Sequence, residues 1–221
     1  MDERLRRSAA HVLVGDIAAP TLDEPTRHHL VRVLRLRDGA SVTATDGRGA
    51  WRACTLRGGA LEVDEAPVAT ARRDPPVTIA VAPPKGDRLE WLVAKCTEVG
   101  VDRIVLLDAE RSVVRWPADR AERQLERLRR VAGEAAMQSR RVWLPEVSGP
   151  IAAATILADA VAAEPGGRAV TPHDATIAVG PEGGWSPDEL DAAGEAVTLG
   201  DTVLRVETAA VAAAVLMTSR R

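Results

Sequence analysis

Hydrophobic positions follow two different patterns along the chain, and the change falls near residue 70. Before it, short apolar stretches of alternating character are typical of β-strands. We expect strands at residues 11–15, 40–47, 51–56 and 60–68. The "DGRG" at 46–49 predicts a hairpin turn between two of them, because glycine readily adopts the positive φ of such turns. The first 70 residues are therefore predicted to form a small β-rich module.

One helical segment interrupts this module, "EPTRHHLVRVLRL" at residues 24–36. Its spacing places Leu30, Val33 and Leu34 on one side of the helix. The other side carries three arginines: Arg27, Arg32 and Arg35.

Beyond a polar, proline-ended stretch at 69–76, apolar strands alternate with helical patterns. The predicted strands are 77–82, 102–108, 142–147, 158–164, 175–180 and 196–200. The predicted helices are 86–100, 118–140, one beginning at Ser186, and 207–219. Such alternation predicts an α/β domain with a parallel sheet covered on both faces. We therefore divide the chain into a β module at 1–70, a linker at 71–76 and an α/β domain at 77–221.

Composition narrows the class of protein. The chain has 221 residues, 46% of them hydrophobic, and its apolar runs are shorter than a membrane span requires. Its N-terminus lacks the long apolar stretch of a signal peptide. The two cysteines, Cys54 and Cys96, lie far apart, which argues against a disulfide framework and a zinc site. We expect a cytoplasmic protein without a metal.

The net charge is −3, yet the basic residues concentrate in the first two thirds of the chain. All of them except Lys85 and Lys95 are arginine, whose fork suits phosphates and base edges. A GC-rich genome, which favours arginine codons, explains the same bias equally well. Phe and Tyr are both absent, which excludes the stacking platform of an RRM domain.

Familiar ligand motifs are missing. The sequence has no G-x-G-x-x-G that opens a helix, no P-loop, no H-x-x-x-H and no G-x-S-x-G. Three glycine-bearing segments at predicted strand ends remain: "AAEPGG" at 162–167, "GPEGG" at 180–184 and "LGDTVLRVETAA" at 199–210. After "GPEGG", Ser186, Pro187 and Glu189 predict a capping box that fixes the start of a helix. Open α/β sheets bind ligands at this edge, so we expect a flat organic ligand held by main chain.

The pair "VGPEGGWSPDEL…LGDTVLRVETAAVAA" resembles the carboxyl-terminal signature of the knotted SPOUT methyltransferases. Specifically, the chain is similar to the bacterial RsmE-type family, which methylates N3 of uridine in small-subunit ribosomal RNA. "HHLVRVLRLRDG", "DGRGAWRA", "KGDRLEWLVAKCTEVGV", "ERSVVRW" and "GEAAMQSRR" agree in order. The resemblance implies a PUA-like β-barrel, then an α/β domain whose C-terminus forms a trefoil knot.

The resemblance also implies S-adenosylmethionine as cofactor and a specific uridine of 16S ribosomal RNA, within the small subunit, as substrate. The cofactor would be held by Glu164, Val179, Gly180, Pro181, Glu182, Gly183, Gly184, Leu199, Gly200, Val203, Leu204, Arg205, Thr208 and Ala209. At the end of the 158–164 strand, family members often carry Leu-His-Glu where this chain has "AAE". A homodimer through the knotted domain is implied as well.

Two residues are candidates for catalysis. Arg205 would stabilise the negative charge that spreads onto the uracil oxygens as the N3 proton leaves. Glu207 would orient Arg205 or accept that proton. A structural ion pair at the start of the last helix is the alternative for both. The RNA would be contacted by Arg32, Arg35, Lys85, Arg88, Arg111, Glu134, Gln138 and Arg140.

Three other functions remain open: ribose 2′-O methylation on the same fold, a non-catalytic RNA-binding assembly factor, and a small-molecule α/β enzyme. The intact "GPEGG" and "VLR-x-ET" segments count against an assembly factor. The net negative charge favours the small-molecule enzyme.

Overall fold

The computed structural model describes residues 2–219, and the chain divides into two compact units. The first unit comprises the residues up to Arg72 together with Gly133–Leu144, and the second comprises Arg73–Ala132 and Pro145–Arg221. Our sequence-based division placed all of 77–221 in one domain, whereas the structure groups Gly133–Leu144 with the N-terminal unit. The helix α4 (Ala118–Gln138) therefore contributes residues to both units.

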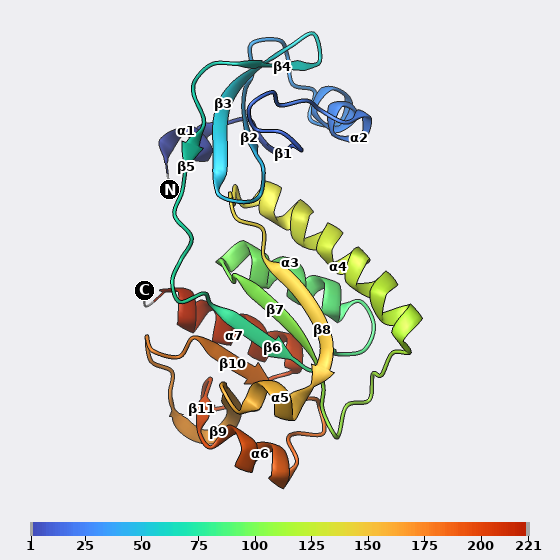
Figure 1. Cartoon of the computed structure of the whole chain (residues 1–221), viewed down its shortest axis with the longest axis vertical. Helices are drawn as coiled ribbons and strands as arrows, with labels where there is room; N and C mark the ends of the chain where they lie inside the picture. The colour runs from blue at the N-terminus through green and yellow to red at the C-terminus, as the bar shows by residue number, and fades with distance from the viewer. Residues whose placement is uncertain (1, 220–221) are drawn as a thin grey trace. The chain divides into compact units, whose positions relative to one another are not determined.

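The first unit is built on a five-stranded sheet (Figure 1). Its elements are α1 (Glu3–Arg7), β1 (Ala10–Leu13), α2 (Glu24–His28), η1 (His29–Val33), β2 (Ser41–Thr45), β3 (Ala50–Arg57), β4 (Ala60–Val63) and β5 (Val68–Ala69). The strands run in the order β1-β2-β3-β4, and β5 pairs with β3. The predicted hairpin joins β2 to β3, and Gly47 and Gly49 both have positive φ. One apolar cluster, which includes Leu30, Val42 and Leu56, forms the core.

The predicted helix at 24–36 is not a single α-helix. It becomes a π-helix, η1, in which the Leu34 N–H donates to the His29 carbonyl at 2.8 Å. The wider π turn rotates the following residues away from the face that α-helical spacing predicts. Leu30 is therefore buried, whereas Val33 and Leu34 are 58% and 44% exposed. Of the three residues that the α-helical pattern placed on one side, the structure therefore buries only Leu30.

The strand predicted at 142–147 is also wrong at its start. Val142 packs with Leu5 and Trp51 in the first unit, and its carbonyl accepts a hydrogen bond from the Gly49 N–H at 2.8 Å. The strand of the second unit, β8, begins only at Glu146. The apolar residues of this stretch therefore belong to two different cores: Val142 packs in the first unit and Val147 in the second. The sequence pattern does not reveal this division.

The second unit contains a six-stranded parallel sheet in the order β11-β9-β10-β6-β7-β8. Its strands are β6 (Thr78–Val81), β7 (Arg103–Asp108), β8 (Glu146–Ala152), β9 (Val161–Ala169), β10 (Thr176–Val179) and β11 (Ala196–Thr198). Its helices are α3 (Arg88–Val99), the first part of α4, α5 (Ala153–Leu157), α6 (Pro187–Ala193) and α7 (Val206–Ser219). The sequence predicted α3, α4, α6 and α7 but not the short helix α5.

Alternate residues of the strands β6, β7, β9 and β10 enter two separate apolar clusters, as expected when both faces of a sheet are covered. Ile79 and Val81 of β6 pack with side chains of α3, α4 and α7. Ala80 of the same strand belongs to the other cluster, which contains side chains of α5 and of the segment before α6. The prediction of an α/β fold with a mainly parallel sheet is therefore confirmed. No helix of residues 2–219 is long and apolar enough to cross a membrane.

Candidate active site

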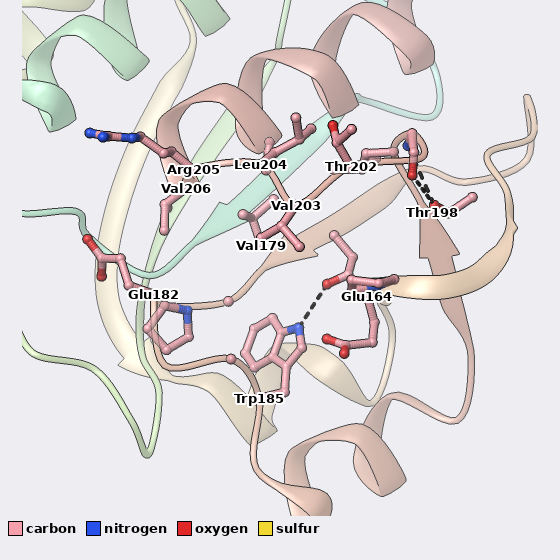
Figure 2. A pocket seen from close by; sticks show the side chains of 18 residues that line it. Glu164, Val179, Glu182, Trp185, Thr198, Thr202, Val203, Leu204, Arg205 and Val206 are labelled. Atoms are coloured by element: carbon pink, nitrogen blue, oxygen red, sulfur yellow. Dashed lines mark hydrogen bonds between the residues drawn. The ribbon is translucent and has the colours of Figure 1, made fainter.

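The carboxyl ends of β10 and β11, together with the middle of the neighbouring strand β9, enclose a cavity of about 430 Å³ (Figure 2). Its walls come from three segments, within residues 163–165, 179–185 and 198–206, and from Ala209 of α7. The order of the strands brings these segments together. β9 lies between β10 and β11 in the sheet, so the three segments belong to adjacent strands. This edge is where open α/β sheets bind ligands.

The segment after β10 has no room for a side chain at Gly180. A Cβ placed there would lie 2.9 Å from Cε2 of Trp185, whose ring is buried. The Trp185 Nε1–H donates to the Ala163 carbonyl at 3.2 Å, which joins the "GPEGG" segment to β9 (Figure 2). Gly184 adopts φ +71°, and its N–H donates to the Pro181 carbonyl at 2.9 Å. The glycines thus permit a tight turn against a buried indole.

The predicted capping box at the start of α6 is present. The Glu189 N–H donates to Ser186 Oγ, and the Ser186 N–H donates to Glu189 Oε2 at 2.9 Å. The second Glu189 oxygen accepts the Glu110 N–H at 2.9 Å, so this buried carboxylate also holds the segment after β7. Arg111 adds two hydrogen bonds, to the carbonyls of Gly183 and Trp185. The "GPEGG" turn is therefore fixed from two sides before any ligand binds.

The third segment differs from its prediction. "AAEPGG" is not a loop at a strand end, because β9 continues through it to Ala169 with an irregular register against β11. A Cβ at Gly167 would lie 2.6 Å from the backbone of Ala196, so glycine allows this close strand contact. Arg168 secures the far end of β9 by bonding Asp174 and Glu195, each at 2.7 Å. The Arg168 hydrogen bonds lower the pKa of Asp174 to about 2.

Residues 199–205, between β11 and α7, form the most open wall. The Thr198 hydroxyl donates to the Gly200 carbonyl at 2.9 Å, and Val203 is 89% exposed although it lines the cavity. Among the described residues, none accepts a hydrogen bond from the backbone N–H of Val203 or Leu204. These unpaired groups are available to a ligand with acceptor atoms.

The cavity combines apolar and acidic surfaces. Val179, Leu199 and Leu204 supply apolar walls, and Glu164 and Glu182 supply carboxylates. Figure 2 shows Glu164 on one side of the cavity, with Arg205 extending away from it on the other. Flat apolar walls, free main-chain donors and carboxylates suit a ligand that is partly aromatic and carries positive charge.

The RNA methyltransferase domain family matches residues 72–218, and the RNA methyltransferase PUA domain family matches residues 22–62. The chain is 34% identical to the ribosomal RNA small subunit methyltransferase E of Mycobacterium bovis, over 89% of this chain and 84% of that protein. It belongs to the ribosomal RNA small subunit methyltransferase E family. The protein of the same name from Synechocystis is 32% identical, over 87% of this chain and 70% of its own length.

A solved structure agrees with this family. The ribosomal RNA small subunit methyltransferase E of Neisseria gonorrhoeae, bound to S-adenosyl methionine, superposes with a TM-score of 0.81 at 26% identity, covering 95% of this chain and 97% of the other. The predicted family, and the predicted order of a PUA domain before an α/β methyltransferase domain, are therefore confirmed.

Most of the residues that the sequence predicted to bind S-adenosylmethionine line the cavity. Only Gly183 and Thr208 do not; Gly183 instead lies against Arg111. The sequence prediction omitted several lining residues: Ala163, Pro165, Trp185, Thr198, Thr202 and Val206. Each of them is adjacent in the chain to a residue that was predicted. Trp185 is the largest of them, and its size beside "GPEGG" is a signal that could have identified it.

The two catalytic candidates, Arg205 and Glu207, have different surroundings. Arg205 is exposed and lines the cavity, and its side chain bonds no described residue. Glu207 does not line it; the Glu207 carboxylate lies 3.7 Å from Arg88 Nε, and its side chain is only 13% exposed. The other Glu207 oxygen, Oε2, is buried without a hydrogen-bond partner in the described structure.

The residues predicted to contact RNA have different surroundings. Arg32, Arg35, Glu134 and Gln138 are exposed in the first unit, and Glu134 and Gln138 share one face of α4. The Arg140 guanidinium instead donates to the Ser8 carbonyl at 2.7 Å, so it has a structural bond. Arg88 and Arg111 are likewise engaged within the second unit, by Glu207 and by the "GPEGG" segment.

The cysteines take no part in the cavity. Both are buried, and desolvation raises the pKa of the Cys54 thiol to about 11 and that of Cys96 to about 12. Thiols in this state are poor nucleophiles. Within the described residues, no group of His, Cys, Asp and Glu side chains could hold a metal ion.

Proposed function

We propose that this chain transfers the methyl group of S-adenosylmethionine to N3 of a specific uridine in 16S ribosomal RNA of the small subunit. The observation that carries the proposal is the convergence of three separate segments, which belong to three neighbouring strands, around one cavity. Membership of the ribosomal RNA small subunit methyltransferase E family supports the class of reaction and substrate.

The cavity fits this cofactor on its own chemistry. S-adenosylmethionine, when bound, supplies an electrophilic methyl group on a positively charged sulfur. The carboxylates of Glu164 and Glu182 favour a positive charge nearby, and the apolar walls favour its aromatic base. The free N–H groups of Val203 and Leu204 would recognise acceptor nitrogens of that base. The cavity volume, about 430 Å³, lies in the range of small-molecule sites.

Arg205 is the residue that we assign to the uracil. Uracil keeps its N3 proton near neutral pH, so negative charge must be stabilised on its oxygens as the proton leaves. An arginine at the rim of the cavity would donate hydrogen bonds to those oxygens, and such donors gain strength where water is excluded. The Arg205 side chain is free to do so, because it bonds no other described residue.

Glu207 suits a positioning role better than that of proton acceptor. Its Oε2 is inaccessible, and its other oxygen holds Arg88 at the start of α3. At the beginning of α7 its charge also interacts favourably with the helix dipole. We therefore propose that Glu207 fixes the segment that carries Arg205, with α3 as its anchor.

The remaining parts of the proposal concern the partner and the assembly. Exposed Arg32 and Arg35, in the unit that contains the PUA match, would contact RNA together with Glu134 and Gln138. We also propose a C-terminal trefoil knot, a homodimer through the second unit and a cytoplasmic location, where small subunits are found. The exposed Trp91 of α3 and Val215 of α7 support an apolar contact between two copies.

Methyl transfer to two substrates tests the proposal. The enzyme, with isotope-labelled S-adenosylmethionine, is incubated with small subunits from cells that lack this activity and, separately, with naked 16S RNA. We expect one label per subunit at most and S-adenosylmethionine binding by calorimetry. Binding without transfer to either substrate would leave a non-catalytic RNA-binding factor as the better description. If S-adenosylmethionine does not bind even at millimolar concentration, the proposal that this chain is a methyltransferase is refuted.

A further inference from the structure

A second cavity lies in the second unit, between the start of α3 and the first half of α4. Its volume is about 280 Å³, and it is lined by residues within 84–90 and 120–128, with Val114 and Trp116. None of these residues lines the cavity at the strand ends. The second cavity is therefore a separate space that the proposed methyl transfer does not use.

Cationic side chains dominate the free groups of this cavity. The side chains of Lys85 and Arg120 are exposed and bond no described residue. Arg127 also lines the cavity but is paired with Glu90, whose Oε1 lies 2.8 Å from the Arg127 Nη2. The carboxylate of Asp87 is the other acidic group in the lining. In the part of the chain that the structure describes, the lining thus has two unpaired cations, Lys85 and Arg120, and one unpaired carboxylate, Asp87.

The main chain adds further donors. The first turn of a helix has N–H groups without intrahelical partners, and the Asp87 side chain does not cap α3. Gly86, with φ +69° and no atom near its would-be Cβ, keeps the approach to this helix start open. A phosphate with lysine and arginine around it, and helix N–H groups in front of it, satisfies all of these donors.

Part of the lining of this cavity is apolar. Trp116, half-buried, Val114 and Leu89 supply surface of the kind on which a sugar or base can rest. Gln124, whose side-chain amide has no hydrogen-bond partner among the described residues, offers both a donor and an acceptor. These features suit a nucleotide rather than an isolated inorganic anion.

One ion pair joins a segment beside the second cavity to a segment beside the first. Arg88 lies in the chain between two lining residues of the second cavity, Asp87 and Leu89. Its partner Glu207 lies two residues after Arg205, which lines the first cavity. A strand of RNA with its target base at Arg205 would therefore have its neighbouring backbone close to the start of α3.

We propose that the second cavity binds one phosphate, with its nucleotide, of the same RNA strand, at a position flanking the methylated uridine. Lys85 and Arg120 hold the phosphate, and Trp116 and Gln124 contact the nucleotide. This inference rests on the proposed function. It assigns Arg120 and Gln124, which no feature of the sequence suggested, to substrate binding.

Steady-state kinetics with 16S RNA or small subunits tests the proposal, with Lys85→Ala, Arg120→Ala and Arg120→Lys as variants. Arg123→Ala is the matched control, because Arg123 lies on the same helix and pairs with Asp119 at the surface. We expect Lys85→Ala and Arg120→Ala each to raise the KM for RNA about fivefold to tenfold. Arg120→Lys should recover most of the loss, and Arg123→Ala should not differ from the wild type.

A salt series separates a phosphate contact from a structural effect. Each lost phosphate contact should reduce the slope of log affinity against log salt by about 0.7 for a single strand. Calorimetry should give an unchanged affinity for S-adenosylmethionine in every variant. The inference is wrong if wild-type enzyme methylates RNA while Arg120→Ala and Lys85→Ala keep its KM and salt slope. If the wild type itself transfers no methyl group, the proposed function fails instead.

Discussion

Gly180→Ala tests whether the cavity depends on close contact between the "GPEGG" turn and the indole of Trp185. The added Cβ would lie 2.9 Å from Cε2, 3.1 Å from Cδ2 and 3.2 Å from Nε1 of that ring. The indole is buried in the same apolar cluster as Ala162 and Ala178 of the sheet, so any movement of the ring would disturb that packing. Either the turn or the ring must therefore shift.

Such overpacking costs about 1–3 kcal/mol. A displaced ring would also weaken the bond from Trp185 Nε1 to the Ala163 carbonyl, a net contribution of about 1 kcal/mol. Both ends of that bond belong to the cavity wall, so cofactor binding should suffer along with stability. At 1.4 kcal/mol per tenfold change, we expect a Kd for S-adenosylmethionine about 10–100 times higher.

Calorimetric titration measures the affinity, and urea unfolding followed by circular dichroism measures the stability. A double-mutant cycle with Trp185→Leu isolates the clash, because leucine lacks the ring atoms that the new Cβ would meet. In the Trp185→Leu background, Gly180→Ala should cost less than about 0.5 kcal/mol of stability. Gly133→Ala is the control: its Cβ meets no atom within 4 Å, and alanine favours a helix. Equal costs for Gly180→Ala in both backgrounds would refute the reasoning.

Three further predictions follow from other contacts. Arg205→Ala should lower kcat about 100-fold, because one donor to the developing charge is lost, while the Kd for S-adenosylmethionine changes less than about threefold. Arg111→Ala removes the bonds to the Gly183 and Trp185 carbonyls and should raise that Kd about threefold to tenfold without abolishing transfer. Burial lowers the pKa of His11 to about 4, below its ordinary value of 6.5, so its stabilising contribution is complete above pH 6.5 and is lost as pH falls toward 4. The stability lost by pH 4 should be roughly 3 kcal/mol, and His11→Gln should remove that part of the acid sensitivity in urea unfolding at several pH values.

Each of these has a contrary outcome. A normal kcat for Arg205→Ala would mean that a group other than Arg205 stabilises the negative charge on the uracil oxygens. Unchanged cofactor affinity in Arg111→Ala would mean that Glu189 alone holds the turn through its bonds to Ser186 and Glu110. An identical pH profile for His11→Gln and wild type would show that other groups govern acid unfolding.

Local signals predicted the parts of the site that local physics fixes. The Ser186–Glu189 capping box and the hairpin at Gly47 both occur where the sequence indicates. In each case one or two residue types satisfy a specific backbone requirement, so few alternatives compete. The position of the "GPEGG" turn at the sheet edge follows from the alternation of strands and helices.

Tertiary context decided what the sequence could not. The π-helix at His29–Val33 interrupts a stretch whose spacing indicates an α-helix, and Val142 joins a core that is remote in the chain. Glycines at 166 and 167 suggested a loop, but Gly167 serves a close strand contact with β11. Glu207 looked like a catalytic carboxylate because it follows Arg205, yet its burial against Arg88 is invisible in a linear sequence.

The most direct test of the central claim is the chemical position of the transferred methyl group. Small subunits from cells that lack the activity are labelled by the purified enzyme, and their 16S RNA is digested to nucleosides for mass analysis. The account predicts 3-methyluridine, with the label on the base, and about 100-fold slower formation of it by Arg205→Ala. Label on the ribose, as 2′-O-methyl nucleoside, would contradict the assignment of Arg205 to the uracil oxygens.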